Sequence, residues 1–213
     1  KLDIGTRKPA FGGASFGPVG TYEYVAGVAT VRLDPRHPAN RAIVDVDKAP
    51  LVVERLMSPE MFSGWGVRTL ATTMGAYNPL GYHNGSVWPH DNAIIAAGMA
   101  RYGFTDEAGT VASAILDAAA AFGGRLPELF CGFDRSEYAA PVPFPTSCSP
   151  QAWAAATPLL LMRSLFRLEP SVSQGEVRVA PILPERFLPL WLSNIIIGGS
   201  RVSLRADGSG IDV

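Results

Sequence analysis

The spacing of apolar and polar residues changes twice along the chain and predicts three segments. Residues 1–50 combine a glycine-rich start with TYEYVAGVATVRL (21–33), whose alternation is typical of a β-strand. Between 51 and 170, apolar residues recur at helical spacing and are separated by long loops. Short alternating runs joined by glycines fill 171–213. We therefore expect a β-rich segment, a mainly helical segment and a small C-terminal sheet with these bounds.

Around the first boundary the pattern predicts a strand, a helix and a loop in turn. RAIVDVDKAP (41–50) predicts a second short strand, which Pro50 ends. LVVERLMS (51–58) has a helical apolar period, and the glycines of FSGWGVRTL (62–70) indicate an extended loop. The expected C-terminal strands lie in EVRVAPILP (176–184), LSNIIIGGSRVSLRAD (192–207) and GIDV (210–213).

Two consecutive helices are expected between residues 89 and 123. Pro89 stands where the first turn of a helix tolerates proline, and Gly103 suits the position after the last turn. Thr105 is expected to cap the next helix, which should stop at Gly123. The short connection between them predicts a helical hairpin.

A third helix is expected after the irregular stretch 125–148. Ser149 can cap this helix, with Pro150 in its first position. Pro158 lies inside it and is expected to kink it, because proline has no N–H and its ring crowds the preceding turn.

The composition narrows the class of partner. Hydrophobic residues make up 47% of the chain and charged residues 17%, which predicts a folded protein with a substantial core. The net charge is −1, so neither nucleic acid nor an anionic membrane surface is an expected partner. Cys131 and Cys148 match neither a disulfide framework nor a zinc spacing. With no long apolar run, we expect a cytoplasmic protein with free thiols.

A dense polar and aromatic cluster precedes the first of these helices, in YHNGSVWPHDNAIIA (82–96). Its members are Tyr82, His83, Asn84, Trp88, His90 and Asp91. Aromatic faces suit the C–H surfaces of a sugar, and the polar groups suit its hydroxyls. His83 and His90 are too far apart to share one helical face, so we expect no metal and no cofactor. Alternatively, Asp91 only satisfies backbone N–H groups at the helix start.

Glu128 follows a proline in RLPELFCGF and stands between apolar residues. Burial by Leu126, Leu129 and Phe130 would raise the pKa of its carboxyl toward neutrality, as a general base requires. Alternatively, Glu128 caps a neighbouring helix or pairs with Arg125. The residues alone leave both interpretations open.

From about residue 51 the chain resembles the C-terminal part of bacterial amylo-α-1,6-glucosidases of the glycogen debranching enzyme type. The resemblance rests on FSGWGVRTLA, NPLGYHNGSVWPHDNAIIAAGMARYG, RLPELFCGF and SCSPQAWAAATPLLL, in this order. It implies a mainly α fold, a partial (α/α)₆ toroid, that hydrolyses α-glucosidic bonds with inversion. The implied partner is an α-glucan or an oligosaccharide.

The resemblance also implies roles for individual residues. Glu128 matches the catalytic base, which would activate a water molecule. The wall of the substrate pocket would comprise Tyr82, His83, Asn84, Trp88, His90, Asp91, Gln151, Trp153 and Trp65.

An inverting mechanism also needs a general acid, with the two carboxyl groups about 6.5–9.5 Å apart. In the resembled family this acid is an aspartate of earlier helices, which this chain does not contain, so Asp91 is the candidate substitute. If no group substitutes, the chain is a non-catalytic carbohydrate-binding remnant.

A partial toroid would leave apolar helix faces without partners. The residues concerned are Ile94, Ile95, Met99, Ile115 and Leu116. We therefore expect either the N-terminal segment to cover them or two chains to form a homo-oligomer.

Residues 1–50 instead resemble the N-terminal segment of a family of α/β-hydrolase-domain proteins, so the chain resembles a join of two pieces. GASFG places Ser15 in a G-x-S-x-G pattern. A nucleophile elbow needs a strand before it and a helix after it, and the flanking prolines favour neither. An ester hydrolase is therefore a further alternative, supported only by this segment.

Overall fold

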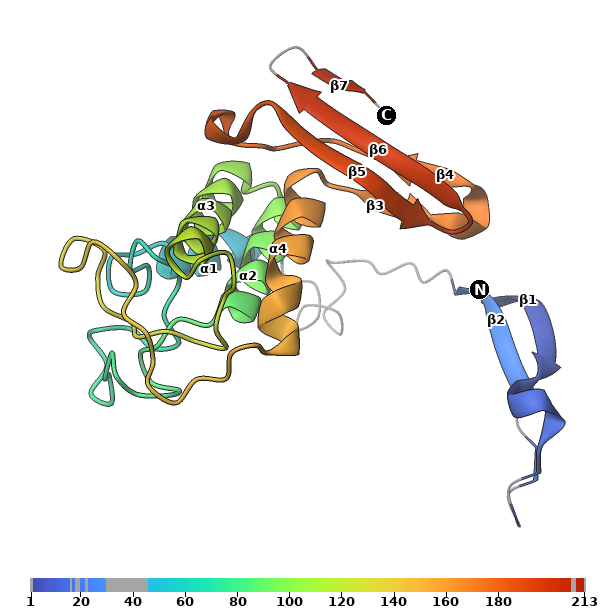
Figure 1. The fold of residues 1–213 in the computed structure, drawn as a ribbon, viewed down its shortest axis with the longest axis horizontal. Helices are drawn as coiled ribbons and strands as arrows, with labels where there is room; N and C mark the ends of the chain where they lie inside the picture. Colours follow the sequence, from blue (N-terminus) through green and yellow to red (C-terminus); the bar gives the residue numbers. More distant parts are fainter. Residues whose placement is uncertain are drawn as a thin grey trace. The chain divides into compact units, whose positions relative to one another are not determined.

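The chain folds as two units, which are described separately. The computed structural model describes residues 2–15, 17, 20–21, 23–29, 46–207 and 210–212. Backbone contacts divide the chain into Lys1–Val46 and Asp47–Val213 (Figure 1). Among the helices in the described ranges, none combines the length and the apolar character needed to cross a bilayer.

In the described residues of the first unit, β1 (Leu2–Pro9) pairs with β2 (Glu23–Ala29) as an antiparallel hairpin. A 3₁₀ turn, η1 (Ala10–Gly13), follows β1. β2 confirms the strand predicted by alternation, whereas β1 forms in the glycine-rich start, where the pattern predicts none. Residues 30–33 and 41–45, which carry the rest of the predicted strands, lie outside the described residues.

A 3₁₀ turn, η4 (Val46–Lys48), leads into the first helix, α1 (Ala49–Leu56). Pro50 stands in the first turn of α1, so the prediction that it ends a strand is wrong. Proline fits there because the first N–H groups of a helix have no partner within the helix. A long loop region then connects α1 to the helical hairpin.

The predicted hairpin is confirmed as α2 (Pro89–Tyr102) and α3 (Thr105–Ala121). α2 ends on Gly103 in the left-handed conformation (φ 91°), where glycine has no steric penalty. The capping prediction for Thr105 is wrong, because this residue lies inside α3 and Phe104 precedes the helix without a side-chain cap. Two acidic residues in the first turn of α3 provide favourable charge at its N-terminus instead.

The third predicted helix is α4 (Ala152–Leu165), which packs against α2. It begins later than predicted, because the backbone of Gln151 is still extended (φ −136°, ψ 137°). Ser149 and Pro150 therefore lie before the helix. Pro158 lies inside the helix, which continues to Leu165, and the kink at this residue stays a prediction.

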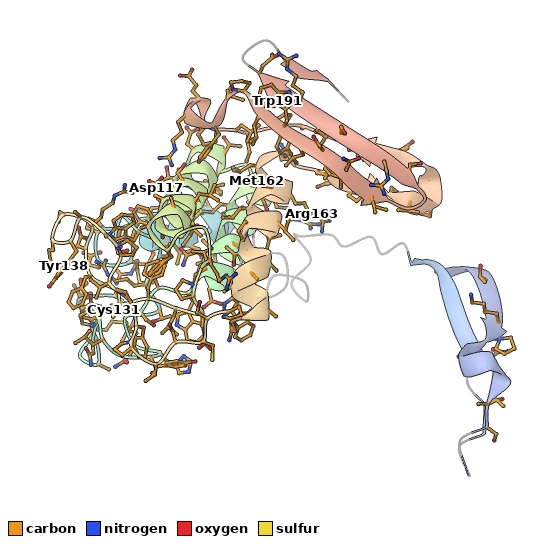
Figure 2. The ribbon with its side chains drawn as sticks, viewed as in Figure 1. Asp117, Cys131, Tyr138, Met162, Arg163 and Trp191 are labelled. Carbon is orange, nitrogen blue, oxygen red and sulfur yellow. The ribbon has the colours of Figure 1, made fainter. Side chains whose placement is uncertain are left out.

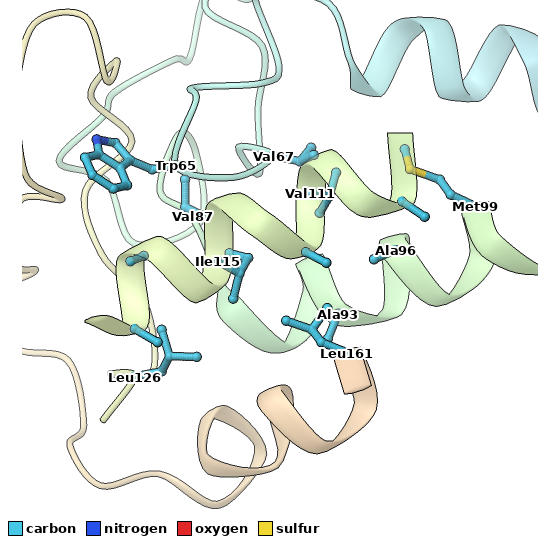
Figure 3. Packing of buried hydrophobic residues seen from close by; sticks show 14 of the residues in the cluster. Trp65, Val67, Val87, Ala93, Ala96, Met99, Val111, Ile115, Leu126 and Leu161 are labelled. Atoms are coloured by element: carbon cyan, nitrogen blue, oxygen red, sulfur yellow. The ribbon is translucent and has the colours of Figure 1, made fainter. Parts of the chain in front are cut away.

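The main hydrophobic core lies where α2, α3 and α4 meet the long loops (Figure 3). Met99 and Ile115 are 3% and 0% exposed, so the prediction that they lack partners is wrong. Ile95 and Leu116 are partly buried and pack against the same core. Of these five residues, only Ile94 is largely exposed, at 60%. The loop-borne Trp65, Val67 and Val87 supply the apolar contacts that the sequence pattern does not reveal.

The C-terminal part forms two small antiparallel sheets, whereas the alternation predicts a single small sheet. β3 (Glu169–Ser171) pairs with β4 (Glu176–Arg178), and η5 (Val172–Gln174) joins them. The second sheet has the order β5–β6–β7, with bounds Leu190–Ile197, Ser200–Asp207 and Gly210–Asp212. The strand predicted in 176–184 is shorter than expected and ends at Arg178. The described residues of this unit therefore build a mainly α fold with a small β part.

Asp117 of α3 links the helices to the C-terminal part (Figure 2). Its two carboxylate oxygens face two arginines: Arg135 Nη1 lies 2.9 Å from Oδ2, and Arg186 Nη2 pairs with Oδ1. Arg186 belongs to η6 (Glu185–Phe187), between the two sheets. The hydrogen bond from Arg186, reinforced by Arg135, lowers the pKa of Asp117 despite its partial burial.

Candidate functional site

Most of the site residues predicted from the sequence line one cavity of about 350 Å³. Its lining residues are Thr69, Tyr82, His83, Trp88, His90, Asp91, Glu128 and Trp153. They come from the loops before α2, the first turn of α2, the loop after α3 and the first turn of α4. Segments far apart in the sequence therefore meet at one place.

Backbone pairing brings these segments together. Val87 and Phe130 exchange two hydrogen bonds, with N···O distances of 2.9 and 3.0 Å. Val87 immediately precedes Trp88, and Phe130 lies two residues after Glu128. The N–H of Glu128 also donates to the carbonyl of Cys148 at 2.9 Å, which connects this strand-like segment to the chain entering α4.

The carboxylate of Glu128 accepts hydrogen bonds from three donors. Tyr82 Oη and Gln151 Nε2 donate to Oε1 at 2.6 and 2.8 Å, and the N–H of Cys148 donates to Oε2 at 3.2 Å. The residue is only 6% exposed. A carboxylate with this many donors is stabilised in its ionised form.

The predicted pKa shift of Glu128 has the wrong direction. The hydrogen bond from Tyr82, with further donors at Cys148 and Gln151, lowers the pKa and outweighs the opposing effect of burial. Leu126, Leu129 and Phe130 are indeed buried, but the three donors decide the charge state. The same hydrogen bond raises the pKa of Tyr82 to about 12, so this phenol remains a donor at neutral pH. Arg125 is not an ion-pair partner of Glu128 among the described residues.

Aromatic rings form the wall of the cavity. The rings of His83 and Trp88 are stacked with centroids 5.3 Å apart, and those of His90 and Trp153 are stacked at 4.1 Å. Tyr82 meets Trp88 edge-on at 5.0 Å. Trp153 is 49% exposed, so one large apolar surface remains open to a ligand. Flat rings beside hydroxyl and carboxylate groups match the alternating apolar and polar surface of a sugar.

Asp91 is the second carboxylate that lines the cavity. It lies in the first turn of α2, and its side chain is 49% exposed. His90 Nε2 lies 2.9 Å from Asp91 Oδ1. His90 Nδ1 is buried and has no hydrogen-bond partner, which fits an imidazole that donates from Nε2. No group of three or more side chains suited to hold a metal ion occurs in the described ranges.

Three residues predicted for the pocket do not line it. Trp65 is buried in the main core, with the guanidinium of Arg135 4.1 Å from its ring centroid. Asn84 is used inside its own loop, where Nδ2 donates to the carbonyl of Ala76 at 2.6 Å. Gln151 contacts Glu128 but is not among the residues that line the cavity.

Two residues of the site were not indicated by sequence reasoning. Thr69 lines the cavity, and its Oγ1 accepts a hydrogen bond from the N–H of Gly85 at 2.9 Å. The buried Asn92 accepts from the N–H of Val67 at 2.7 Å and donates to the carbonyl of Trp88 at 2.9 Å. Its position directly after His90 and Asp91, at the start of α2, is the signal that the sequence offers.

Ser15 belongs to the first unit and forms an isolated bridge with Thr21. The 3₁₀ turn η1 precedes it, rather than the strand that a nucleophile elbow requires.

Both cysteines are free thiols, with Cys131 buried and Cys148 exposed. Burial raises the pKa of the Cys131 thiol.

Residues 40–131 match the family model described as the mannosylglycerate hydrolase MGH1-like glycoside hydrolase domain. This range includes the loop 82–91 and Glu128, and it ends before Gln151 and Trp153. The match covers less than half of the chain and supports a glycosidase function in general. It supports neither the resemblance to amylo-α-1,6-glucosidases in particular nor that of residues 1–50 to α/β-hydrolases. No curated protein matches the chain.

Proposed function

We propose that the chain is a glycoside hydrolase that cleaves α-glucosidic bonds with inversion, with Glu128 as the general base. One observation carries the proposal: an ionised carboxylate with three hydrogen-bond donors stands in a cavity walled by stacked aromatic rings. The hydrogen bond between Tyr82 and Glu128 keeps the carboxylate ionised and the phenol protonated at neutral pH.

A general base must be ionised before it can take a proton from water. The lowered pKa of Glu128 keeps it ionised across the neutral range, and the donors Tyr82 and Gln151 fix its orientation. A low pKa also makes it a weaker base, because the strength of a base falls with its pKa. The two donors thus favour a correct charge state and position at the expense of basicity.

We assign the general acid to Asp91, which lines the same cavity. The acid must donate a proton to the leaving oxygen and then regain one, and the half-exposed side chain of Asp91 can regain it from solvent. The helical hairpin α2–α3 and the adjacent α4 fit part of an (α/α)₆ toroid, in which loops on one side of the helices build the site. A carbohydrate-binding protein without turnover is the alternative, and it follows if Asp91 does not act as the acid.

A second substrate class comes from the matched family, whose name refers to the hydrolysis of mannosylglycerate. That substrate carries a carboxylate. The described residues that line the cavity include two carboxylates and no lysine or arginine. Like charges repel by about 1 kcal/mol at 4 Å even in water, so an uncharged glycoside fits this cavity better.

In the experiment, the full chain is incubated separately with maltooligosaccharides, with a branched glucan and with mannosylglycerate. Product release is followed by chromatography, and binding is measured in parallel by calorimetry. The proposal predicts turnover of a neutral α-glucoside, with proton NMR showing the β-anomer first. Binding without turnover supports the carbohydrate-binding alternative, and preference for mannosylglycerate refutes the proposed substrate class.

We also propose that two chains associate through exposed apolar residues of α2 and α4. Ile94 and Leu159 are 60% and 73% exposed. Light scattering over a range of concentrations should show a dimer that the double substitution Ile94→Ser and Leu159→Ser weakens. A monomer at every concentration would refute the association.

The ester hydrolase alternative predicts esterase activity that is lost in Ser15→Ala.

A further inference from the structure

A second cavity, of about 380 Å³, lies at the C-terminal ends of α2 and α4. It shares no lining residue with the sugar cavity. Arg101 from α2, Arg163 from α4 (Figure 2) and Arg167 from the following connection all line it. We call this cavity the arginine cleft.

The three guanidinium groups form no ion pair with any described residue. Arg163 Nε donates to the carbonyl of Leu168 at 3.3 Å, which leaves its terminal nitrogens available. Glu169 is the one acidic residue that lines the cleft. Three positive charges and one negative charge leave an excess of two positive charges, on a chain whose net charge is −1.

The helix ends favour the charges of the three arginines. Arg101 and Arg163 stand in the last turns of α2 and α4, where a positive charge is favourable beside the unpaired carbonyl groups. Arg167 lies two residues beyond the end of α4, still within one turn of it, so the same effect favours its charge but does not explain why the position is not glycine.

The backbone of Arg167 is left-handed, with φ 45°. It occupies the position after the last turn of α4, where the N–H of Leu168 donates to the carbonyl of Arg163 at 2.9 Å and its own N–H donates to the carbonyl of Ser164 at 3.0 Å. Glycine is the usual residue in this motif, and α2 ends on Gly103 in the same conformation. An arginine here has a steric cost that glycine would avoid, so its side chain is the feature that needs an explanation.

We propose that the arginine cleft binds the phosphate group of a small molecule. A phosphate carries about −1.5 to −2 charges at neutral pH, which matches the excess of two positive charges. Guanidinium groups bind phosphate oxygens through paired, charge-assisted hydrogen bonds. Ala97, Ala100 and Leu160 line the same cavity and offer an apolar surface to the carbon skeleton of such a ligand.

The test titrates the full chain with inorganic phosphate in a calorimeter at constant ionic strength, with acetate as the comparison anion. We expect saturable binding of phosphate and weaker binding of acetate. Arg167→Gly should weaken phosphate binding about tenfold or more while the thermal midpoint is unchanged or higher, because glycine relieves the left-handed backbone. Arg101→Gln should weaken it as well. Arg201→Gln changes an exposed arginine of β6 outside the cleft and should leave binding unchanged.

Opposite effects on binding and stability distinguish a ligand site from a structural role. If Arg167 served only the fold, Arg167→Gly would not change phosphate affinity. The proposal is overturned if phosphate gives no saturable heat, or if Arg167→Gly and Arg101→Gln keep the parent affinity. It is also overturned if Arg201→Gln weakens binding as much as they do, because this would indicate general attraction to positive charge.

Discussion

Tyr82 Oη donates a hydrogen bond to Glu128 Oε1 at 2.6 Å, across 46 residues of sequence. The tyrosine comes from the loop before α2, and the glutamate from the loop after α3. This contact is the largest cause of the lowered pKa of Glu128 and of the raised pKa of Tyr82. It joins the two loops and sets the charge state of the proposed base.

Tyr82→Phe should therefore shift the pH dependence of activity. Without the phenol, the carboxylate loses its main stabilising donor, so the pKa of Glu128 rises toward its ordinary value. Because the base works only when ionised, the acid limb of kcat/KM against pH should move to higher pH. A profile from pH 3 to pH 9 on the parent and the variant measures the shift. An acid limb that stays at the same pH would contradict the claim that Tyr82 controls the ionisation of the proposed base.

Trp153→Ala should weaken binding of the sugar more than it slows the chemical step. The indole is 49% exposed, lines the cavity and stacks on His90 at 4.1 Å. Its loss removes an apolar face, and we expect about a fivefold increase in KM or more. Trp191→Ala, which removes an exposed tryptophan of β5 outside the cavity, is the matched control. Equal effects of both substitutions would argue against a sugar platform at Trp153.

Gly132→Ala should disrupt the packing of the loop after α3 against the loop before α2. A methyl group at residue 132 would collide with the backbone carbonyl of Gly85, which has no flexible side chain to move aside. We expect the free energy of unfolding to fall by about 2 kcal/mol or more, with loss of sugar binding. Gly75→Ala would meet no atom and, like residue 132, does not have a left-handed backbone, so it is the matched control. Urea unfolding followed by fluorescence compares the two.

Asp117→Asn should lower the free energy of unfolding at neutral pH and make it depend less on pH in the acidic range. The arginines lower the pKa of Asp117 in the folded state, so its stabilising contribution is present above the unfolded pKa of about 3.9. That contribution is lost as pH falls through the lower pKa of the folded state. Since these side chains are partly exposed, we expect a loss of no more than about 1 kcal/mol at pH 7. Unfolding in urea between pH 2.5 and pH 7 checks both statements.

The local sequence predicts the helices better than it predicts the pKa of a site residue. The hairpin of α2 and α3 follows from Pro89, Gly103 and the apolar period, because these signals act within a few residues. The pKa of Glu128 could not be predicted, since its donors Tyr82 and Gln151 lie 46 and 23 residues away. Its apolar neighbours suggested the opposite shift.

Placement of single residues failed for the same reason. Trp65 belongs to a motif expected near the pocket, yet its ring is buried in the core, where α2 and α3 supply contacts that no local pattern shows. The local signals Ser149 and Pro150 predict too early a start for α4, because the backbone of Gln151, whose side chain contacts Glu128, is still extended.

The most direct test of the account compares Glu128→Gln with Glu137→Gln, an exposed glutamate in the same loop. Glucose release from a maltooligosaccharide and calorimetric binding of the same sugar are measured on both. We predict that Glu128→Gln lowers the turnover rate at least about a hundredfold and keeps binding within a few fold, while Glu137→Gln behaves as the parent. Undiminished turnover in Glu128→Gln would contradict the assignment of Glu128 as the base.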